Sequence, residues 1–265
     1  MQEKPVFLEP MRHSTLGRRF LTPFYAEYQV LDALEKEPPS LRDALRELVL
    51  SHDYRFLYLR NQKCASTLTV QLLYAWGAGG ETYPGDIHRA NSVIIPARYR
   101  WLDIKPIHEA HMSYLFTFVR NPEARLISAF RDLFLEATDI DGRLHYKAMK
   151  AHGYDPDRDA GYNFDVFLDY VAHSLELDRH ATDRHWRMQV DNIGWREIDY
   201  DFIGRVENFA ADIAQVFQAG GAGDFPPPGL IAPSGTEPAL DITPGQRARI
   251  RQLYAADYEA FGYPV

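Results

Sequence analysis

A single cysteine, Cys64, occurs in the 265 residues, which excludes an internal disulfide framework and a cysteine-based zinc site. No apolar run approaches the about 20 residues that a membrane-spanning helix needs, and the N-terminus has no apolar core of signal-peptide length. Basic residues are fewer than acidic ones: 29 Lys and Arg stand against 37 Asp and Glu, which gives a formal net charge of −8. Such a chain repels polyanions, so we exclude a general binder of nucleic acid or anionic membrane and expect a soluble, cytoplasmic protein. Any bound anion must be held by a local basic site.

The length and the composition are those of a folded globular domain. Hydrophobic residues make up 46% of the chain and charged residues 25%, a balance that excludes wholesale disorder. A chain of this length can build one large domain with a sizeable core. The sequence shows no internal repeat and no low-complexity tract. We therefore predict a single domain over residues 1–265, in which residues 1–50 form an N-terminal strap whose role the sequence does not reveal.

Two segments share the order strand, short polar turn, helix. The first covers residues 55–76 and the second covers residues 114–137. Further elements are predicted as a loop over 139–160, a helix over 163–177, a strand over 200–203, a helix over 207–219 and a last helix that begins at Thr243. Strands that alternate with helices predict an α/β fold with a parallel sheet covered on both faces. Ligands of such sheets bind at the carboxyl ends of the strands, close to helix N-termini.

The turn of the first segment has the residue types of a phosphate cradle. A turn between a buried strand and a helix presents unpaired backbone N–H groups, and the helix dipole adds positive potential. Lys63 adds a full charge, and Ser66 and Thr67 add hydroxyl donors. The turn lacks the two glycines and the adjacent Lys-Ser/Thr pair of a Walker A loop, so an anion is expected in a different arrangement. The alternative is an ordinary helix cap beside a solvated lysine.

The turn of the second segment places an arginine at the end of a strand. Arg120 can hold a phosphate through its planar fork, and Ser128 follows eight residues later, about two helical turns away. Asn121 is a natural N-cap residue, and Pro122 is a natural first helical residue. Taken alone, Arg120 could equally be the partner of a structural ion pair. A structural ion pair explains less well why candidate anion sites stand at the ends of two strands.

The two turns together resemble motifs of the sulfotransferase superfamily. LYLRNQKCASTLTVQLL is similar to its 5′-phosphosulfate loop, and FVRNPEARLISAFRD is similar to its 3′-phosphate motif. The closest likeness is to carbohydrate sulfotransferases of the chondroitin, dermatan and heparan 2-O type. Three further stretches resemble elements of these enzymes: HWRMQ at 185–189, with Met188 where proline is usual, IDYDFIGRVENFAADIAQV at 198–216 and TPGQRARIRQLYAADYEAFGY at 243–263. The resemblance covers residues 55–265.

The resemblance implies a P-loop-NTPase-like, three-layer α/β fold with a central parallel sheet flanked by helices. It implies a donor, 3′-phosphoadenosine 5′-phosphosulfate, whose sulfuryl group passes to an acceptor hydroxyl, that of a carbohydrate by this likeness, leaving adenosine 3′,5′-bisphosphate. Lys63, Cys64, Ala65, Ser66 and Thr67 would hold the 5′-phosphosulfate. Arg120 and Ser128 would hold the 3′-phosphate. Sulfuryl transfer needs charge neutralisation on the leaving oxygen, for which Lys63 is the cation, and no metal is expected.

A proton acceptor for the acceptor hydroxyl is expected among the histidines or a carboxylate. HMSYL, which begins at His111, resembles a segment of heparan 2-O-sulfotransferases whose histidine is the presumed base. The resemblance therefore implies His111 as the base and His108 as its neighbour, with Glu109 and His185 as the alternatives. His108 and His111 could also bind a metal, although they do not form an HExxH motif. For His185 the alternative is an imidazole packed beside Trp186.

The acceptor would be a sugar or another molecule that carries a hydroxyl group. Arg98 and Arg100 are interleaved with aromatic residues and could line an acceptor groove, or they could belong to a solvated basic loop. Glu109 and His185 are the other candidates for contacts with the acceptor. Two other functions stay open: a nucleotide-dependent kinase on the same kind of fold, and a non-catalytic module that senses the nucleotide. The sequence leaves the oligomeric state open.

Overall fold

A computed structural model describes the chain apart from residues 1–5, 7–19, 86, 88–93, 97–108, 136–139, 228, 232–239 and 265. The chain divides into two compact units. We call one the sheet unit, which contains residues 12–119 and 191–233, and the other the helical unit, which contains residues 1–11, 120–190 and 234–265. The predicted single domain over residues 1–265 stays a prediction. None of the helices in the described part of the chain is long and apolar enough to cross a membrane.

The sheet unit is built on a five-stranded sheet with the strand order β3-β1-β2-β4-β5. Its strands are β1 (Leu48–Ser51), β2 (Phe56–Leu59), β3 (Ile94–Pro96), β4 (Tyr114–Val119) and β5 (Phe202–Arg205). β2, β4 and β5 run parallel to one another, as the sequence predicts. β1 pairs antiparallel with β2, and β3 pairs antiparallel with β1. These two strands, which lie on one side of the sheet, were not predicted from the sequence.

The three parallel strands bring their carboxyl ends to one edge of the sheet. Leu59, at the end of β2, pairs with Thr117 of β4. Val119, at the end of β4, pairs with Arg205 of β5. The turn after β2 begins with Arg60, and the residue after β4 is Arg120. Both predicted anion-binding segments therefore start where a parallel strand ends.

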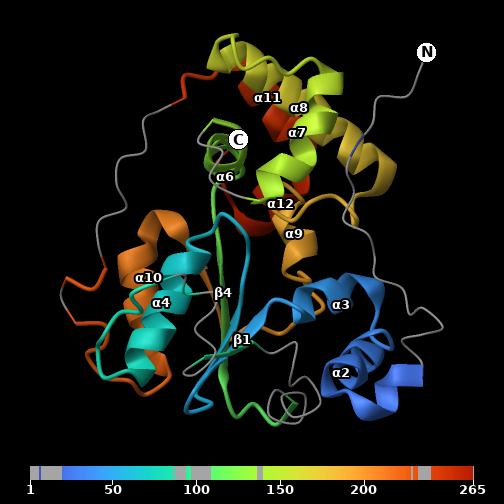
Figure 1. Ribbon diagram of the computed structural model, residues 1–265. Helices are drawn as coiled ribbons and strands as arrows, with labels where there is room; N and C mark the ends of the chain where they lie inside the picture. The colour runs from blue at the N-terminus through green and yellow to red at the C-terminus, as the bar shows by residue number, and fades with distance from the viewer. Residues whose placement is uncertain are drawn as a thin grey trace. The chain divides into compact units, whose positions relative to one another are not determined.

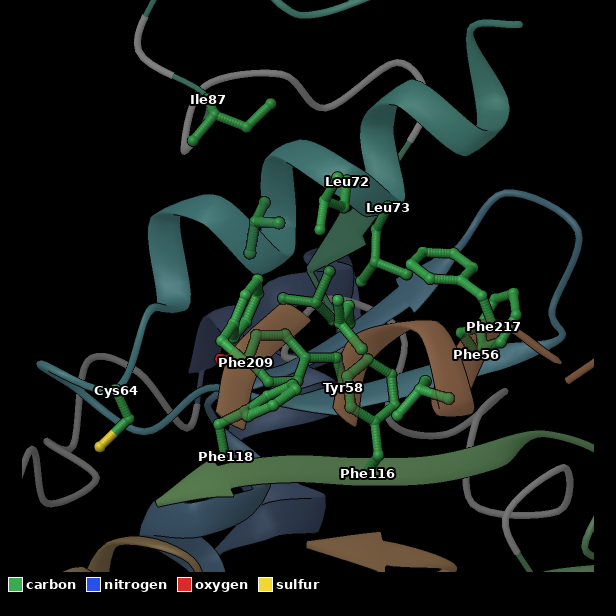
Figure 2. Packing of buried hydrophobic residues seen from close by; sticks show 14 residues of the cluster. Phe56, Tyr58, Cys64, Leu72, Leu73, Ile87, Phe116, Phe118, Phe209 and Phe217 are labelled. Carbon is green, nitrogen blue, oxygen red and sulfur yellow. The ribbon is translucent and has the colours of Figure 1, made fainter. Parts of the chain in front are cut away.

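One face of the sheet is covered by α4 (Ser66–Gly77) and α10 (Phe209–Ala219), as Figures 1 and 2 show. Aromatic rings of β2 and β4 fill this core, and the rings of Tyr58 and Phe116 stack at a centroid distance of 5.0 Å. A Cβ atom on Gly204 of β5 would lie 2.4 Å from the ring of Phe118, so only glycine fits there. Leu57 and Leu59, which face the opposite side of β2, are also buried, so both faces of the sheet are covered as predicted.

The remaining helices include those predicted over 163–177, over 207–219 and from Thr243, and others that the sequence did not predict. The sheet unit also contains η1 (Thr22–Phe24), α2 (Ala26–Leu34), α3 (Pro39–Leu45) and η5 (Val206–Asn208). The helical unit contains α6 (Pro122–Phe130), a π-helical continuation over Arg131–Leu135, α7 (Ile140–His152), α8 (Ala160–Asp178), α11 (Pro244–Leu253) and α12 (Ala255–Phe261), and the short α9 (Gln189–Asn192) joins the chain segments of the two units. The predicted loop over 139–160 is wrong, because residues 140–152 form α7. Its buried residues include Ala148 and Met149, so its apolar side packs in a core despite many charges.

The core of the helical unit is aromatic. Trp186 is fully buried, and its ring packs against Phe167 at 5.4 Å and against His145 at 4.6 Å between centroids. The hydroxyl of Tyr254 donates to the carbonyl of Trp186 over 2.5 Å. α8 begins with Asp159 as its cap, and α11 begins with the capping box of Thr243 and Gln246 that the sequence predicts. The turn over residues 182–188 is therefore held in a closely packed interior.

Candidate functional site

The N-terminus of α4 has no side-chain cap. Its N-cap residue is Ala65, in a left-handed conformation with φ 56° and ψ 28°, and it makes no side-chain capping hydrogen bond. An alanine has no side-chain oxygen with which to cap the first N–H groups of a helix, and such groups have no backbone partner within the helix. Because the positive end of the helix dipole lies at the same place, this end is suited to an anion.

The loop before α4 has an alternating backbone conformation. Lys63 and Ala65 both have positive φ angles, of 62° and 56°, on either side of Cys64. Such alternation turns successive N–H groups toward one side and forms an anion-binding concavity. Ser66 is buried at the first position of the helix, and Lys63 is half-buried, so both lie where the sequence places them. The side chain of Cys64 is fully buried and belongs to the hydrophobic cluster, at whose edge Figure 2 shows it, so it does not face solvent.

Two polar residues anchor the loop. Asn61 is fully buried, its Nδ2 donates to the carbonyl of Phe118 over 3.1 Å, and its Oδ1 accepts from Nδ2 of Asn192 over 3.2 Å. Arg60 pairs with Glu47 over 2.8 Å, and its backbone N–H donates to the carbonyl of Glu47 over 3.0 Å. Asn61 thus joins the end of β2 to the end of β4. Sequence analysis assigned no role to Asn61 or Glu47, although an amide directly after a buried strand is a usable signal for such a link.

The N-terminus of α6 differs from that of α4, because it is capped by its own chain. The side chain of Asn121 accepts hydrogen bonds from the N–H groups of Glu123 and Ala124, over 2.9 Å and 3.3 Å. This confirms the predicted cap, with Pro122 as the first helical residue. An anion at this segment would therefore be held by side chains. Ser128 is buried on α6, and Arg120 is half-buried directly before the cap.

The backbone of Arg120 is held by Gln189. Its N–H donates to Oε1 of Gln189 over 2.9 Å, and its carbonyl accepts from Nε2 of Gln189 over 2.8 Å. Gln189 is in turn held by Asp257, which accepts from the N–H groups of Gln189 and Val190 over 2.9 Å and 3.0 Å. Burial raises the pKa of Asp257 to about 6, because desolvation outweighs these hydrogen bonds. Sequence analysis named the HWRMQ stretch but did not assign Gln189 this part.

The turn over residues 182–188 places two histidines on one carboxylate. Nδ1 of His185 lies 2.7 Å from Oδ1 of Asp183, and Nε2 of His145 lies 2.9 Å from Oδ2 of the same group. Burial acts to raise the pKa of Asp183, but hydrogen bonds with His145 and His185 hold it well below the usual value. The packing of the His185 ring beside Trp186 stays a prediction, and the histidine ring that packs against Trp186 is that of His145. His145 and Asp183 were not found from the sequence, because His145 falls in the segment predicted as a loop.

The other predicted site residues are less enclosed. Glu109 and His111 are exposed in the segment before β4, and His111 has a positive φ of 50°. Thr67 is exposed in the first turn of α4. His108, Arg98 and Arg100 lie outside the described residues. Within the described part of the chain, no group of three His, Cys, Asp or Glu side chains is arranged to hold a metal ion.

A mixed sheet whose central strand β2 leads into a helix N-terminus without a side-chain cap defines an α/β protein with a helix end suited to an anion at the edge of its sheet. Residues 46–264 match the sulfotransferase family, and the chain belongs to that family. Carbohydrate sulfotransferase 14 of Danio rerio is 26% identical over 247 residues, which cover 86% of this chain and 65% of that protein.

Two further relatives have the same kind of name. Carbohydrate sulfotransferase 10 of Danio rerio is 29% identical over 180 residues, which cover 60% of this chain and 49% of that protein. Carbohydrate sulfotransferase 12 of Mus musculus is 30% identical over 171 residues, which cover 56% of this chain and 40% of that protein. The chain thus spans 40% to 65% of the length of these three relatives. No solved structure matches the chain significantly.

Proposed function

We propose that this protein is a sulfotransferase that moves a sulfuryl group from 3′-phosphoadenosine 5′-phosphosulfate to a hydroxyl group of a carbohydrate. The observation that carries the proposal is the uncapped N-terminus of α4, preceded by Lys63 and opened by Ser66, in a chain of the sulfotransferase family. The names of the three relatives support a carbohydrate acceptor. The kinds of residue at the two strand ends support a donor with two anionic groups.

The loop before α4 would hold the 5′-phosphosulfate. The N–H groups of the first helical turn and the hydroxyl of Ser66 can donate hydrogen bonds to its oxygens. Lys63 supplies the positive charge that the bridging oxygen needs as the S–O bond breaks. In an in-line displacement the leaving group gains negative charge, and a fixed cation stabilises that charge more in the transition state than in the ground state. Lys63 should therefore act on the rate of transfer more than on donor affinity.

The segment after β4 would hold the 3′-phosphate. A guanidinium group can donate two parallel hydrogen bonds to a phosphate, and the hydroxyl of Ser128 can add a third. Asn121 already satisfies the N–H groups of Glu123 and Ala124, so selectivity for the 3′-phosphate would come from these two side chains. This assignment predicts that Arg120 distinguishes a 3′,5′-bisphosphate from a 5′-monophosphate.

The acceptor hydroxyl must lose a proton as it attacks sulfur. A histidine or carboxylate within hydrogen-bond reach would accept that proton, and the sequence offers His111, His108, Glu109 and His185. Arg98 and Arg100 stay candidates for contacts with acidic groups of the acceptor.

The test compares the wild type with Lys63→Ala, in assays of sulfate transfer from the radiolabelled donor to a panel of polysaccharides and simple sugars. We expect transfer by the wild type and its loss in Lys63→Ala, with an unchanged unfolding midpoint. Lys147→Ala is the matched control, because Lys147 is exposed on α7. Near-wild-type turnover of Lys63→Ala would contradict the role of the loop.

Measurements of ligand binding distinguish this proposal from a kinase and from a non-catalytic sensor of the nucleotide. We expect adenosine 3′,5′-bisphosphate to raise the unfolding midpoint more than 5′-ADP or ATP with magnesium at equal concentration. At about 100 times its dissociation constant a ligand adds about 2.7 kcal/mol to the free energy of unfolding. A shift with ATP and magnesium alone would support a kinase. Binding of the bisphosphate without transfer to any acceptor would support a non-catalytic sensor.

A further inference from the structure

A pocket lies in the sheet unit, on the segment that leads into β5. Its volume of about 450 Å³ falls in the range of about 300–1,000 Å³ that is usual for small-molecule sites. Its wall is formed by residues 195–200 and by Ile203 of β5. None of these residues has a part in the proposed binding of the donor, so the pocket is open to another ligand.

Both ends of this segment are fixed within the sheet unit. At its start, Nδ2 of Asn192 donates to Oδ1 of Asn61 in the loop before α4, over 3.2 Å. At its end, Asp201 exchanges two hydrogen bonds with the backbone of Leu115 in β4, since its N–H donates over 2.9 Å and its Oδ2 accepts over 2.7 Å. The pocket and the loop that carries Lys63 therefore belong to one compact unit.

The turn that carries the pocket is closed by its own backbone. The N–H groups of Glu197 and Ile198 both donate to the carbonyl of Gly194, over 2.9 Å and 3.1 Å. Ile198 is buried, and a Cβ atom on Gly194 would lie 3.3 Å from its Cδ1 atom. The hydroxyl of Tyr200 donates to the carbonyl of Ile193 over 2.5 Å, which restrains the ring. A ligand would therefore meet a wall that is already formed, which lowers the entropic cost of binding.

Two aromatic side chains line the pocket. Trp195 and Tyr200 are half-buried, so each keeps part of its ring accessible. Indole and phenol rings offer flat apolar faces, on which the C–H groups of one face of a pyranose ring can stack. The aromatic part of the wall thus suits a ligand that has flat apolar faces.

Charged side chains complete the wall. Arg196, Glu197 and Asp199 are exposed at the pocket. No described residue makes a hydrogen bond or an ion pair with the side chain of Arg196 or Asp199. Carboxylates accept hydrogen bonds from hydroxyl groups, a guanidinium donates them, and such charge-assisted bonds are about twice as strong as neutral ones. Aromatic faces beside such groups fit a ligand that is rich in hydroxyl groups, namely a sugar.

The charges of the wall favour a sugar that carries no charge. One guanidinium against two carboxylates gives the wall a formal charge of −1, and the whole chain carries −8. A sulfate or carboxylate group of a ligand would be repelled by Glu197 and Asp199. A sugar unit that offers only hydroxyl groups meets no such repulsion.

We propose that this pocket is a saccharide subsite, which holds an uncharged sugar unit of the acceptor other than the unit that receives sulfate. The inference rests on the proposed function, because a carbohydrate acceptor is part of it. Trp195 and Tyr200 stack on the sugar ring, and Arg196, Glu197 and Asp199 bind its hydroxyl groups. The subsite adds affinity for long acceptors and takes no part in the chemical step. Because each transfer adds a negative charge, the subsite favours stretches of a glycan that are not yet sulfated.

Affinity electrophoresis tests the subsite without donor and without turnover. Native gels contain dextran, a mannan, a galactan or glycol chitin, or the chemically sulfated form of the same polymer, with inorganic phosphate present to occupy the loop before α4. We expect at least one neutral polymer to retard the wild type and its sulfated form to retard it less. Trp195→Ala should weaken this binding about tenfold, and Trp195→Phe, which keeps a ring, should retain most of it.

Asp199→Asn tests the charged part of the wall at an exposed position. It should weaken binding of the neutral polymer about three- to tenfold, because a charge-assisted hydrogen bond becomes a neutral one. Asp224→Asn is the matched control, since Asp224 is exposed in the same unit and should bind like the wild type. With the same polymer as acceptor, Asp199→Asn should raise KM and leave kcat unchanged. If Trp195→Ala does not fold, Asp199→Asn still decides the inference.

The inference would be overturned if none of the four neutral polymers retarded the wild type, or if Trp195→Ala and Asp199→Asn bound them as the wild type does. Stronger retardation by the sulfated forms would also contradict it. The proposed function fails in a different way. A wild type that binds a neutral polymer through Trp195 but transfers sulfate to no acceptor keeps the subsite and is no sulfotransferase, whereas transfer without retardation removes the subsite alone.

Discussion

Gln189 and Arg120 exchange two hydrogen bonds, in which the side-chain amide of Gln189 both accepts from and donates to the backbone of Arg120. The side-chain amide thereby makes the two hydrogen bonds that a neighbouring strand would make with this residue. It fixes the backbone directly after the end of β4. Because Gln189 is fully buried and is itself held by Asp257, the backbone from which the Arg120 side chain extends has little freedom. This pair explains how the chain can hold an arginine in position at the start of a segment that is no longer part of the sheet.

Gln189→Ala should weaken the binding of adenosine 3′,5′-bisphosphate about tenfold and lower the free energy of unfolding by about 1–3 kcal/mol. The two hydrogen bonds are lost, and the N–H and carbonyl of Arg120 are left without them. Isothermal titration calorimetry and denaturant unfolding give the two numbers. Gln215→Ala is the control, because Gln215 is exposed on α10. Unchanged affinity together with lost stability would mean that the pair serves folding alone.

Arg120→Ala should weaken the binding of adenosine 3′,5′-bisphosphate at least tenfold and the binding of AMP far less. The guanidinium group is proposed to contact the 3′-phosphate, which AMP lacks. Arg120→Lys should lie between the two, because an ammonium group keeps the charge but not the paired donors. Competition binding with both nucleotides measures the ratio, and equal losses for both would refute contact with the 3′-phosphate.

Asn61→Ala should lower both stability and donor affinity. The substitution removes the buried link between the ends of β2 and β4 and leaves the carbonyl of Phe118 without that donor, at a cost of about 1–3 kcal/mol. Thermal unfolding with and without adenosine 3′,5′-bisphosphate separates the two effects. We expect the unfolding midpoint of the apoprotein to fall and the ligand-induced shift to shrink. Gln62→Ala, at the half-buried neighbouring position, is the comparison.

Asp257 should make the free energy of unfolding fall as the pH rises from about 4 through 6. Its folded-state pKa of about 6 lies above the ordinary value of 3.8, so the native state binds more protons than the unfolded chain in that range. The stabilising contribution of its protonated form is complete below the range and is lost above it.

Asp257→Asn should flatten this pH dependence, removing about 2 kcal/mol of the change in the free energy of unfolding between pH 4.5 and pH 7.5. Guanidinium unfolding at both pH values measures it, with Asp165→Asn as a control at an exposed position of α8. Asp183 affects the free energy of unfolding at lower pH. Its pKa is lowered in the folded state, so its stabilising contribution is lost only as the pH falls below about 4. A slope equal in the wild type and in Asp257→Asn would show that the carboxyl is ionised throughout.

The features that could be predicted from the sequence are those with a local cause. The buried strands, the Asn121 cap, the capping box at Thr243 and the cradle around Lys63 each arise from residues a few positions apart. The strands β1 and β3 were missed because they are defined by their pairing with each other and with β2, which no local sequence pattern records. Gln189, Asp257, His145 and Asp183 were missed for another reason. Apart from His185, which lies two residues from Asp183, their partners lie between 25 and 69 residues away along the chain, a separation that no single-sequence pattern records.

Ala65 at the start of α4 leaves this helix without the side-chain cap that a serine or an aspartate would provide. A serine or aspartate N-cap typically adds about 1 kcal/mol to the stability of a helix, and an alanine N-cap does not. Any small oxyanion can supply the missing acceptor, so sulfate and phosphate in a buffer should compete with the nucleotide for the same N–H groups. Both would stabilise the protein against heat while inhibiting it.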